Sequence, residues 1–419
     1  MPGYDLIVIG GGPAGVFAAG YAAQNGIRVL LLEKNRRIGA KVLITGKGRC
    51  NVTNSEPDVR KFAENFGRNG KALLTALYAY GVQEVIDFFE QRGLPLTVER
   101  GGRVFPSHGG AKDVQQVLEK FMHESGVESR CDCTVTGLSS TGGHIAAVQT
   151  NQGELDAKMV LVATGGLSYP ETGCTGDGYR WAKELGLKVV EPQPALTGIA
   201  LEESWTGDVC DLNLKNVELK VLQQGKVQGA RFGEAFFTRE GIGGPIVLDL
   251  SNKVRKLLEA GPVELALDFK PAVGKELFDK RLQREISENA NKDFGNSLGA
   301  LLPKTMIPLF IELSGIDASI KCHSITREQR HTLLGLFKDL RLHVAGCGGY
   351  DKAIVTRGGI DLKELDMRTL QAKAFDNLFF AGEVLDLDGP TGGFNLQVCW
   401  STGYLAGTSI AERLHAETG

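Results

Sequence analysis

The sequence lacks a long apolar run: no stretch of its 419 residues approaches the ~18 that a membrane-spanning helix needs. It also shows no secretory signal, because a strand-like segment begins at Tyr4 where charged, apolar and small-residue zones would stand. The formal net charge of -3 excludes a surface coated in positive charge, although it leaves room for a local basic face. We therefore expect a cytoplasmic protein without a membrane segment.

Paired CxxC motifs are also missing, although the chain has 8 cysteines. Cys131 and Cys133 are two positions apart, so they share one face of a strand, which is poor spacing for zinc. The simplest interpretation is reduced thiols in a cytoplasmic protein. We predict no metal site.

The chain is too long for one hydrophobic core, so two or three domains are expected. Its first third alternates short apolar runs with helical patterns, as a parallel sheet with crossover helices does. Strands are predicted at 4–9 and 28–32, and helices at 13–25 and 71–92.

After Pro194 strand-like segments dominate, then helical ones, before the α/β pattern resumes. We therefore predict an α/β fold in which one discontinuous nucleotide-binding domain is interrupted by two inserts. The predicted boundaries are 1–191 and 342–419 for the nucleotide-binding domain, 192–269 for a β-rich insert and 270–341 for a helical insert.

The segment GGGPAG, from Gly10 to Gly15, follows a strand and opens a helix. Gly10 permits the tight turn, Gly12 lets the backbone approach a pyrophosphate, and Gly15 lets helix and strand pack closely. The helix N-terminus offers free N–H groups to phosphates. Glu33 ends the second strand, where an acid can accept ribose hydroxyls. Strand, helix and acid together predict a dinucleotide site, whereas a turn with convenient glycines would leave Glu33 unexplained.

A loop from Arg36 to Asn54 is rich in basic and small residues. Lys41 and Arg49 are candidates to neutralise a pyrophosphate, and Gly46 would let the backbone run close to a flat ligand. Asn51 either binds that ligand or caps a helix. The alternative interpretation of the whole segment is a solvated basic surface loop.

Two more glycine-rich turns follow buried strands. Ala163–Gly165 has the small residues that a sharp exit past a dinucleotide needs, and Leu378–Glu383 is a strand that ends in an acid. Gly392–Leu396 then opens the last helix, predicted at 397–414, whose N-terminus can stabilise negative charge on a reduced flavin. Alone each is an ordinary βα turn, but with the N-terminal motif they bracket an extended cofactor, FAD.

The candidate cofactor-binding residues come from these turns and the basic loop. They are Gly10, Gly12, Pro13, Ala14, Gly15, Glu33, Lys34, Lys41, Gly46, Arg49, Asn51, Val135, Ala163, Thr164, Gly165, Gly382, Glu383, Gly393, Phe394, Asn395 and Leu396.

Cys50 is the candidate catalytic side chain, with Arg49 beside it. A neighbouring cation lowers the pKa of a thiol. Such a thiol could protonate one carbon when hydride adds to the other carbon of a double bond. The alternative is that Cys50 is a small packing residue, which is the commoner use of a free cysteine.

The chain resembles two-dinucleotide-binding-domain flavoproteins and, more narrowly, the BaiN/RdsA family of NAD(P)/FAD-dependent oxidoreductases. The matching segments stand in the family's order: GKGRCNVTN (46–54), GGRVFP (101–106), GGLSYPETGCTGDGYRWAKELG (165–186), FTREGIGGPIVLDLS (237–251), LLPK (301–304), AIVTRGGI (353–360) and FAGEVLDLDGPTGGFNLQ (380–397). The resemblance implies a split Rossmann-like FAD-binding domain with an inserted β-barrel-like domain and a small helical domain, and noncovalent FAD. Arg239 stands where the family often has His, and Ile242 where Ser is usual, which leaves the substrate open.

The resemblance implies three activities: reduction of a uracil in large-subunit ribosomal RNA to dihydrouridine, oxidation of a small amine such as an aminoketone, and steps on steroid or bile-acid-like substrates. Our first hypothesis is reduction of an activated C=C bond, with the rRNA uracil as substrate. A flavin oxidase and a binding protein with a structural FAD are the alternatives. Because FAD needs the one clear dinucleotide fingerprint, NAD(P)H would bind transiently at the flavin face.

The helical insert 270–341 carries 12 lysines and arginines against 9 acids, a balance of 12 − 9 = +3. This mild excess suits docking to RNA, but it suits any solvated helical bundle as well.

Overall fold

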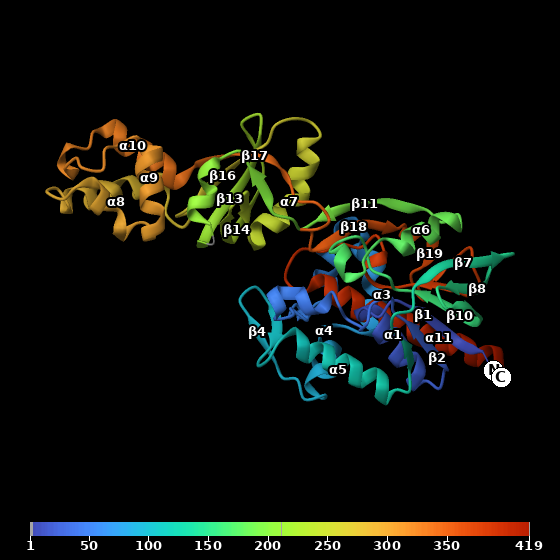
Figure 1. Cartoon of the computed structure of the whole chain (residues 1–419). Coiled ribbons are helices and arrows are strands. Elements are labelled where there is room, and N and C mark those ends of the chain that lie inside the picture. Colours follow the sequence, from blue (N-terminus) through green and yellow to red (C-terminus); the bar gives the residue numbers. More distant parts are fainter. Residues whose placement is uncertain (1–2, 211, 419) are drawn as a thin grey trace. The chain divides into compact units, whose positions relative to one another are not determined.

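The computed structural model describes residues 3–210 and 212–418, and the chain forms two compact units. The first unit combines Met1–Ala195 with Tyr350–Gly419, and the second is Leu196–Gly349 (Figure 1). The chain therefore leaves the first unit once and returns to it once. The return falls later than the predicted residue 342, because β17 (Leu340–Cys347) still pairs with a strand of the second unit.

A seven-stranded sheet with the strand order β19-β20-β21-β10-β1-β2-β6 forms the centre of the first unit. Its strands are β1 (Tyr4–Ile9), β2 (Val29–Leu32), β6 (Glu128–Arg130), β10 (Ala157–Val162), β19 (Leu365–Asp366), β20 (Gln371–Ala372) and β21 (Leu378–Phe380). The pairs from β21 to β6 are parallel, and β19 and β20 form an antiparallel edge. All of β2 and most of β1 are buried, as expected for parallel strands covered on both faces.

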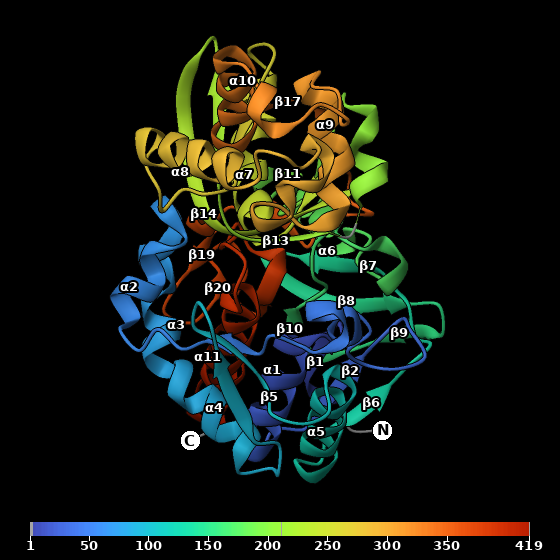
Figure 2. The ribbon, with the colours of Figure 1, turned by 90° about the vertical axis from the view of Figure 1, so that its left-hand side faces the viewer.

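The first and last helices of this unit, α1 (Pro13–Gln24) and α11 (Phe394–Thr418), pack against each other (Figures 1 and 2). Two glycines of α11 make this close approach possible. A Cβ at Gly403 or Gly407 would lie 2.4 Å from the backbone oxygen of Ala14 or Ala18. Direct packing of these two helices therefore holds the N-terminal and C-terminal segments of the first unit together.

Short sheets and helices surround this core. The sheets are β3 (Thr53–Asn54) with β5 (Arg103–Pro106) and β4 (Leu96–Glu99); β7 (Val135–Thr141) with β8 (His144–Thr150) and β9 (Gly153–Leu155); and β11 (Val189–Ala195) with β18 (Val355–Ile360). The helices are α2 (Val59–Glu64), α3 (Leu74–Ala79), α4 (Val82–Glu90), α5 (Ala111–Glu124) and α6 (Asp177–Glu184).

The single helix predicted at 71–92 is wrong, because the chain breaks it into α3 and α4. Tyr80 has an extended backbone between them, with φ −152° and ψ 91°. Its carbonyl accepts a hydrogen bond of 2.6 Å from Ser401 Oγ on α11. A contact with the other end of the chain therefore replaces the helical hydrogen bond that local periodicity predicts.

The second unit contains a closed barrel with the strand order β12-β15-β14-β13-β16-β17. Besides β17, its strands are β12 (Ile199–Leu201), β13 (Asn213–Gln223), β14 (Lys226–Thr238), β15 (Gly241–Gly243) and β16 (Glu264–Asp268). Leu219, Phe237 and Leu265 are fully buried in its core.

The strand-like interpretation of 195–269 misses one helix, α7 (Pro245–Leu258), which packs on β14. Pro245 occupies the first helical position, where its missing N–H has no cost. Three more helices, α8 (Lys275–Glu288), α9 (Ile307–Ser314) and α10 (Arg327–Lys338), lie between β16 and β17 in sequence (Figure 2). Their phenylalanine rings join the barrel residues in one hydrophobic cluster.

Candidate functional site

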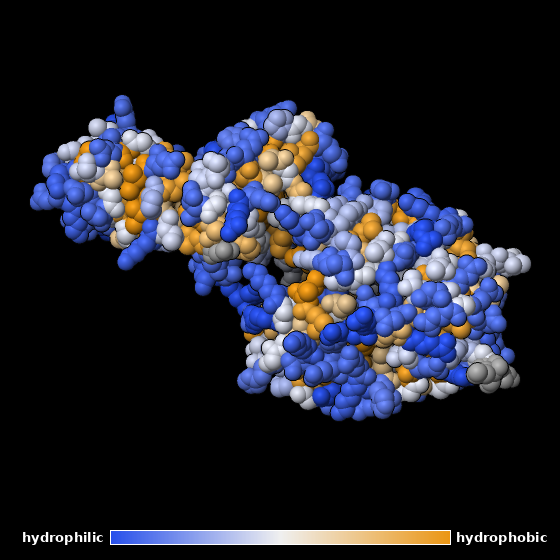
Figure 3. All heavy atoms as spheres, in the orientation of Figure 1, coloured by the Kyte–Doolittle hydropathy of each residue, from blue (hydrophilic) through white to orange (hydrophobic). Residues whose placement is uncertain are grey.

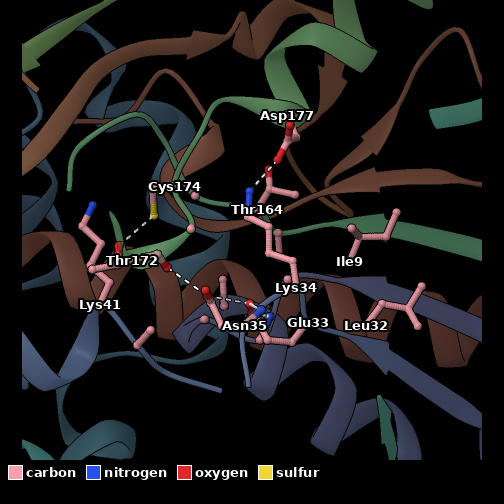
Figure 4. A pocket seen from close by; sticks show the side chains of 18 of the residues that line it. Ile9, Leu32, Glu33, Lys34, Asn35, Lys41, Thr164, Thr172, Cys174 and Asp177 are labelled. Atoms are coloured by element: carbon pink, nitrogen blue, oxygen red, sulfur yellow. Dashed lines mark hydrogen bonds and ion pairs between the residues drawn. The ribbon is translucent and has the colours of Figure 1, made fainter. Parts of the chain in front are cut away.

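A cavity lies where the carboxyl ends of β1, β2 and β10 meet (Figure 4). Its walls are Ile9–Ala14 after β1, Leu32–Asn35 after β2, and Ala163–Gly165 after β10, closed by Glu383 after β21. Ligands of open α/β sheets bind in the crevice outside these strand ends. The predicted turns after β1, β10 and β21 therefore reach one cavity, although they come from distant parts of the chain.

The turn between β1 and α1 shows why its glycines have this spacing. Gly10 has a φ of 109°, and a Cβ there would lie 2.5 Å from the backbone oxygen of Ala163. A Cβ on Gly15 would lie 1.9 Å from the oxygen of Gly10. At Gly12 a Cβ would meet nothing within 4 Å, so this backbone is open to a ligand. The cavity is lined by Gly10, Gly12, Pro13 and Ala14. Gly15 does not line it but packs against the backbone of Gly10.

Glu33 is buried at the end of β2, where three hydrogen bonds hold its carboxylate. The backbone N–H of Gly11 donates to Oε2 at 2.8 Å, and the backbone N–H and side-chain amide of Asn35 donate to Oε1, each at 2.8 Å. A carboxylate has about four acceptor positions, so it can still accept a ribose hydroxyl. Glu33 thus fixes the glycine turn as well as facing the cavity.

Lys41 and Glu383 form an ion pair in the wall of the cavity, although they are 342 residues apart in sequence. The distance from Lys41 Nζ to Glu383 Oε2 is 2.7 Å. Ser168 Oγ and the backbone N–H of Thr356 each donate to Glu383 Oε1 at 3.0 Å. Burial alone would lower the pKa of Lys41, but the charge of Glu383 outweighs it and the pKa is raised. The cation predicted for the pyrophosphate is therefore held by a carboxylate of the same chain.

Lys34 also lines the cavity, with its ammonium held by the opposite wall. Its Nζ lies 2.7 Å from Asp177 Oδ2 (Figure 4). The same Nζ donates a hydrogen bond to Thr175 Oγ1. Asp177 begins α6. This ion pair therefore connects the end of β2 with the start of α6.

Three free thiols line the cavity, and the sequence analysis did not predict them as site residues. They belong to Cys133, Cys174 and Cys399. Burial, followed by the nearby charge of Glu383, raises the pKa of Cys399 to about 12, and burial also raises the pKa of Cys174. Cys174 and Cys399 are therefore neutral thiols at physiological pH. Nothing in their spacing connects them, because they come from three separate elements.

Other lining residues that were not predicted include Asn35, Thr172, Gly173, Asp177 and Trp181. The signal for three of them was present in the run Thr172–Tyr179, which is rich in glycine and threonine but is equally typical of a turn before a helix. Only their position opposite the β1–α1 turn assigns them to the cavity.

The second half of the basic loop does not line the cavity. Arg49 forms an ion pair with Glu99 and lies over the ring of Phe105, 4.2 Å from its centroid. Asn51 Oδ1 accepts a hydrogen bond of 3.1 Å from the backbone N–H of Val104. Gly46 is exposed within the helical turns Val42–Gly48. Arg49 and Asn51 thus support the small sheet beside the cavity.

The expectation that Arg49 lowers the pKa of Cys50 is wrong. Cys50 is fully buried, and burial raises the pKa of its thiol to about 12. The guanidinium of Arg49 instead donates a hydrogen bond to the carboxylate of Glu99 at the surface. Cys50 belongs to the hydrophobic cluster of the first unit, as the packing interpretation has it.

The C-terminal glycine turn is also used for packing. A Cβ on Gly393 would lie 2.2 Å from the backbone of Thr53. Asn395 Oδ1 accepts from the backbone N–H of Gly389 at 2.8 Å, and Phe394 packs on Phe62 with ring centroids 4.8 Å apart. The helix starts at Phe394, earlier than the predicted 397. Of this motif, Glu383 lines the cavity, whereas Gly382, Gly393, Phe394, Asn395 and Leu396 do not.

The cavity fits a dinucleotide on two observations. Gly12 leaves room beside the N-terminus of α1, where phosphates are favoured. Thr164 Oγ1 is buried in the lining, and it has no hydrogen-bond partner among the described residues. Such orphaned polar atoms are rare in folded proteins and indicate a group that the chain itself does not supply.

A family model described as HI0933-like protein Rossmann domain matches residues 4–409. The chain belongs to the HI0933-like family. It is 30% identical to the 3-dehydro-bile acid delta(4,6)-reductase of Clostridium scindens, over 97% of this chain and 98% of that protein. It is 29% identical to the ribosomal RNA dihydrouridine synthase of Escherichia coli, over 96% of this chain and 97% of that protein. The predicted resemblance is confirmed.

Two solved structures share the fold of this HI0933-like chain. One is 3-ketosteroid delta1-dehydrogenase from Sterolibacterium denitrificans, with a TM-score of 0.57 at 13% identity over 99% of this chain and 100% of that one. The other is a flavocytochrome c3 fumarate reductase, with a TM-score of 0.53 at 18% identity over 98% and 78%. The predicted Rossmann-like α/β class is confirmed, and the HI0933-like chain is an FAD-dependent oxidoreductase. In the described part of the chain, no helix combines the length and apolar character needed to span a membrane.

Proposed function

We propose that this chain uses noncovalent FAD and electrons from NAD(P)H to reduce an activated C=C bond, and that the substrate is a uracil in large-subunit ribosomal RNA. The observation that carries the proposal is the activity for which its full-length relatives are named. A dihydrouridine synthase and a bile acid delta(4,6)-reductase are both named for saturating a ring double bond. The two substrates differ in size and charge, but the bond to be reduced is of one kind.

FAD, when bound, supplies the hydride-transfer chemistry. Around it, the N-terminus of α1 and the open backbone at Gly12 would hold the pyrophosphate, and Glu33 would accept the ribose hydroxyls. Lys41, fixed by Glu383 and Ser168, would place a positive charge beside the chain that joins ribose to flavin. The thiols of Cys174 and Cys399 stay neutral and add no competing charge.

NAD(P)H is proposed as a transient donor because the sequence has one clear dinucleotide fingerprint, and FAD occupies it. An rRNA substrate would place the reaction in the cytoplasm. The second candidate is reduction of a steroid enone, which the 30% identity to the bile acid reductase supports.

The test begins with purified flavoprotein mixed with NADPH and then NADH without oxygen, while the flavin absorbance near ~450 nm is followed. We expect rapid bleaching, then reoxidation by rRNA that lacks dihydrouridine, with a gain of two hydrogens at one uridine. Reoxidation by a steroid dienone, and not by RNA, would shift the assignment to the second candidate. Bleaching by a small amine, and by neither nucleotide, would overturn the reductase.

A further inference from the structure

The segment from residue 34 to 54 is strongly one-sided in charge. It carries six lysines and arginines and no aspartate or glutamate. Two of the six, Lys34 and Lys41, line the cavity and are held there by carboxylates. The other four are exposed outside it: Arg36, Arg37, Lys47 and Arg49.

The first turn of α5 lies against this segment and adds a fifth cation. Gln115 Nε2 donates to the carbonyl of Ile38 at 2.6 Å, directly after Arg37. A Cβ on Gly110 would lie 2.5 Å from the carbonyl oxygen of Gly48. Lys112 is exposed between these two contacts. We call the resulting group, Arg36, Arg37, Lys47, Arg49 and Lys112, the basic rim.

The carboxylates beside the basic rim are already engaged. Glu99 is paired with Arg49, and Asp113 Oδ2 accepts the backbone N–H of Gly110 at 2.7 Å at the start of α5. In Figure 3 the visible surface over α4 and α5, the helix that carries Lys112, is mainly hydrophilic. Against these two carboxylates, the five cations of the rim leave a formal excess of 5 − 2 = +3.

We propose that the basic rim binds the phosphate backbone of RNA beside the flavin cavity. The inference rests on the proposed function, because it names how a nucleic-acid substrate is held. Cations spread over two elements suit a row of phosphates better than one phosphate, and backbone phosphates supply most of the affinity for nucleic acid. A steroid has no such row of charges, so the rim would have no use with the second candidate substrate.

The test uses the full-length, FAD-loaded protein and a fluorescently labelled single-stranded RNA with the target uridine. Arg36→Gln/Arg37→Gln removes two charges from the rim, and Lys183→Gln/Lys188→Gln removes two exposed charges from another part of the first unit. Affinity is measured by anisotropy between about 50 and 200 mM salt. We expect the rim variant to bind about tenfold more weakly, with a salt slope shallower by about 1.4, which corresponds to two lost phosphate contacts. The control variant should match the unmodified protein.

Anaerobic bleaching by the nicotinamide donor keeps folding and flavin loading under observation, and both variants should bleach like the unmodified protein. If the unmodified protein reduces the RNA and the rim variant binds it as the control does, the basic rim is overturned while the proposed function stands. If the unmodified protein neither binds nor reduces RNA, the proposed function fails and the rim proposal with it.

Discussion

The two glycine turns that open α1 and α11 have similar local sequences and opposite surroundings. Gly12 has open space where a side chain would start, whereas Gly393 has the backbone of Thr53 2.2 Å away. Both turns follow strands of one parallel sheet, and the two helices pack on each other. One turn therefore offers its backbone to a ligand, and the other uses its missing side chain to hold the protein together.

This difference shows what a glycine motif alone can predict. The pattern of strand, glycines and helix indicates that the backbone approaches something closely. It does not say whether that partner is a cofactor or another segment of the chain. Substitution can test the contrast between Gly12 and Gly393. A side chain at Gly12 should weaken ligand binding, whereas one at Gly393 should lower stability.

Gly393→Ala should have the largest effect on stability. The residue has a φ of 99°, and the new Cβ would clash with Thr53, so backbone strain and overpacking add. We expect a loss of about 4 kcal/mol in the free energy of unfolding of the cofactor-free protein. Urea denaturation measures it. A loss below about 1 kcal/mol, the average for any substitution, would show that the turn is not packed as described.

Gly12→Val should leave that stability almost unchanged, because the φ of −79° is allowed for valine and a Cβ there would meet no protein atom within 4 Å. It should weaken FAD binding at least about hundredfold, since the side chain fills the space beside the helix N-terminus. Titration of stripped protein with FAD tests this. Gly274→Val at the N-cap of α8 is the control, because that glycine has a φ of −61° and a Cβ there would also meet nothing within 4 Å. Equal FAD affinity in both variants would contradict the account.

Lys41→Met should cost about 2 kcal/mol of stability, less than for a fully buried pair because the side chains of Lys41 and Glu383 are 21% and 15% exposed. Lys188→Met, which breaks the exposed pair with Asp361, should stay within about 0.5 kcal/mol. Since the pKa of Lys41 is raised, its contribution is complete below the ordinary value of 10.5 and is lost as pH rises through the higher value. Thermal unfolding between pH 7 and the alkaline range should show the loss. An equal loss of stability in the two variants would show that the Lys41–Glu383 pair contributes no more than an exposed ion pair.

Cys50→Ala should have the smallest effect, a loss of about 1 kcal/mol from a small core cavity. Product formation should remain, because a fully buried thiol contributes packing and not a proton. Loss of product with normal flavin reduction by the nicotinamide donor would instead identify Cys50 as the acid.

Much of the fold was predictable where a local pattern decides it. The strand at 4–9 and the helix after it were placed to within one residue, because burial of β1 and the proline at the first position of α1 are local signals. The break at Tyr80 and the helix at Pro245–Leu258 were not predicted. The first depends on a hydrogen bond from Ser401, and the second was hidden among strand-like neighbours.

The site divides in the same way. Turns at strand ends can be predicted because the carboxyl ends of parallel strands meet at one edge. The Lys41–Glu383 pair and the three thiols could not, because only the tertiary fold brings residues from such distant segments together. The same reason explains why Arg49 and Asn51 were assigned to the cofactor although they support the neighbouring sheet.

The central claim is that this cavity holds FAD, and thiol labelling tests it most directly. Stripped and FAD-loaded protein would be treated with iodoacetamide at pH 9, where thiols with a raised pKa react slowly, and each cysteine would be followed by mass spectrometry. Cys210, in the second unit, is the internal control. We predict that FAD slows labelling of Cys174 and Cys399 at least about tenfold and leaves Cys210 unchanged. Labelling of Cys174 and Cys399 at the same rate with and without FAD would contradict the claim.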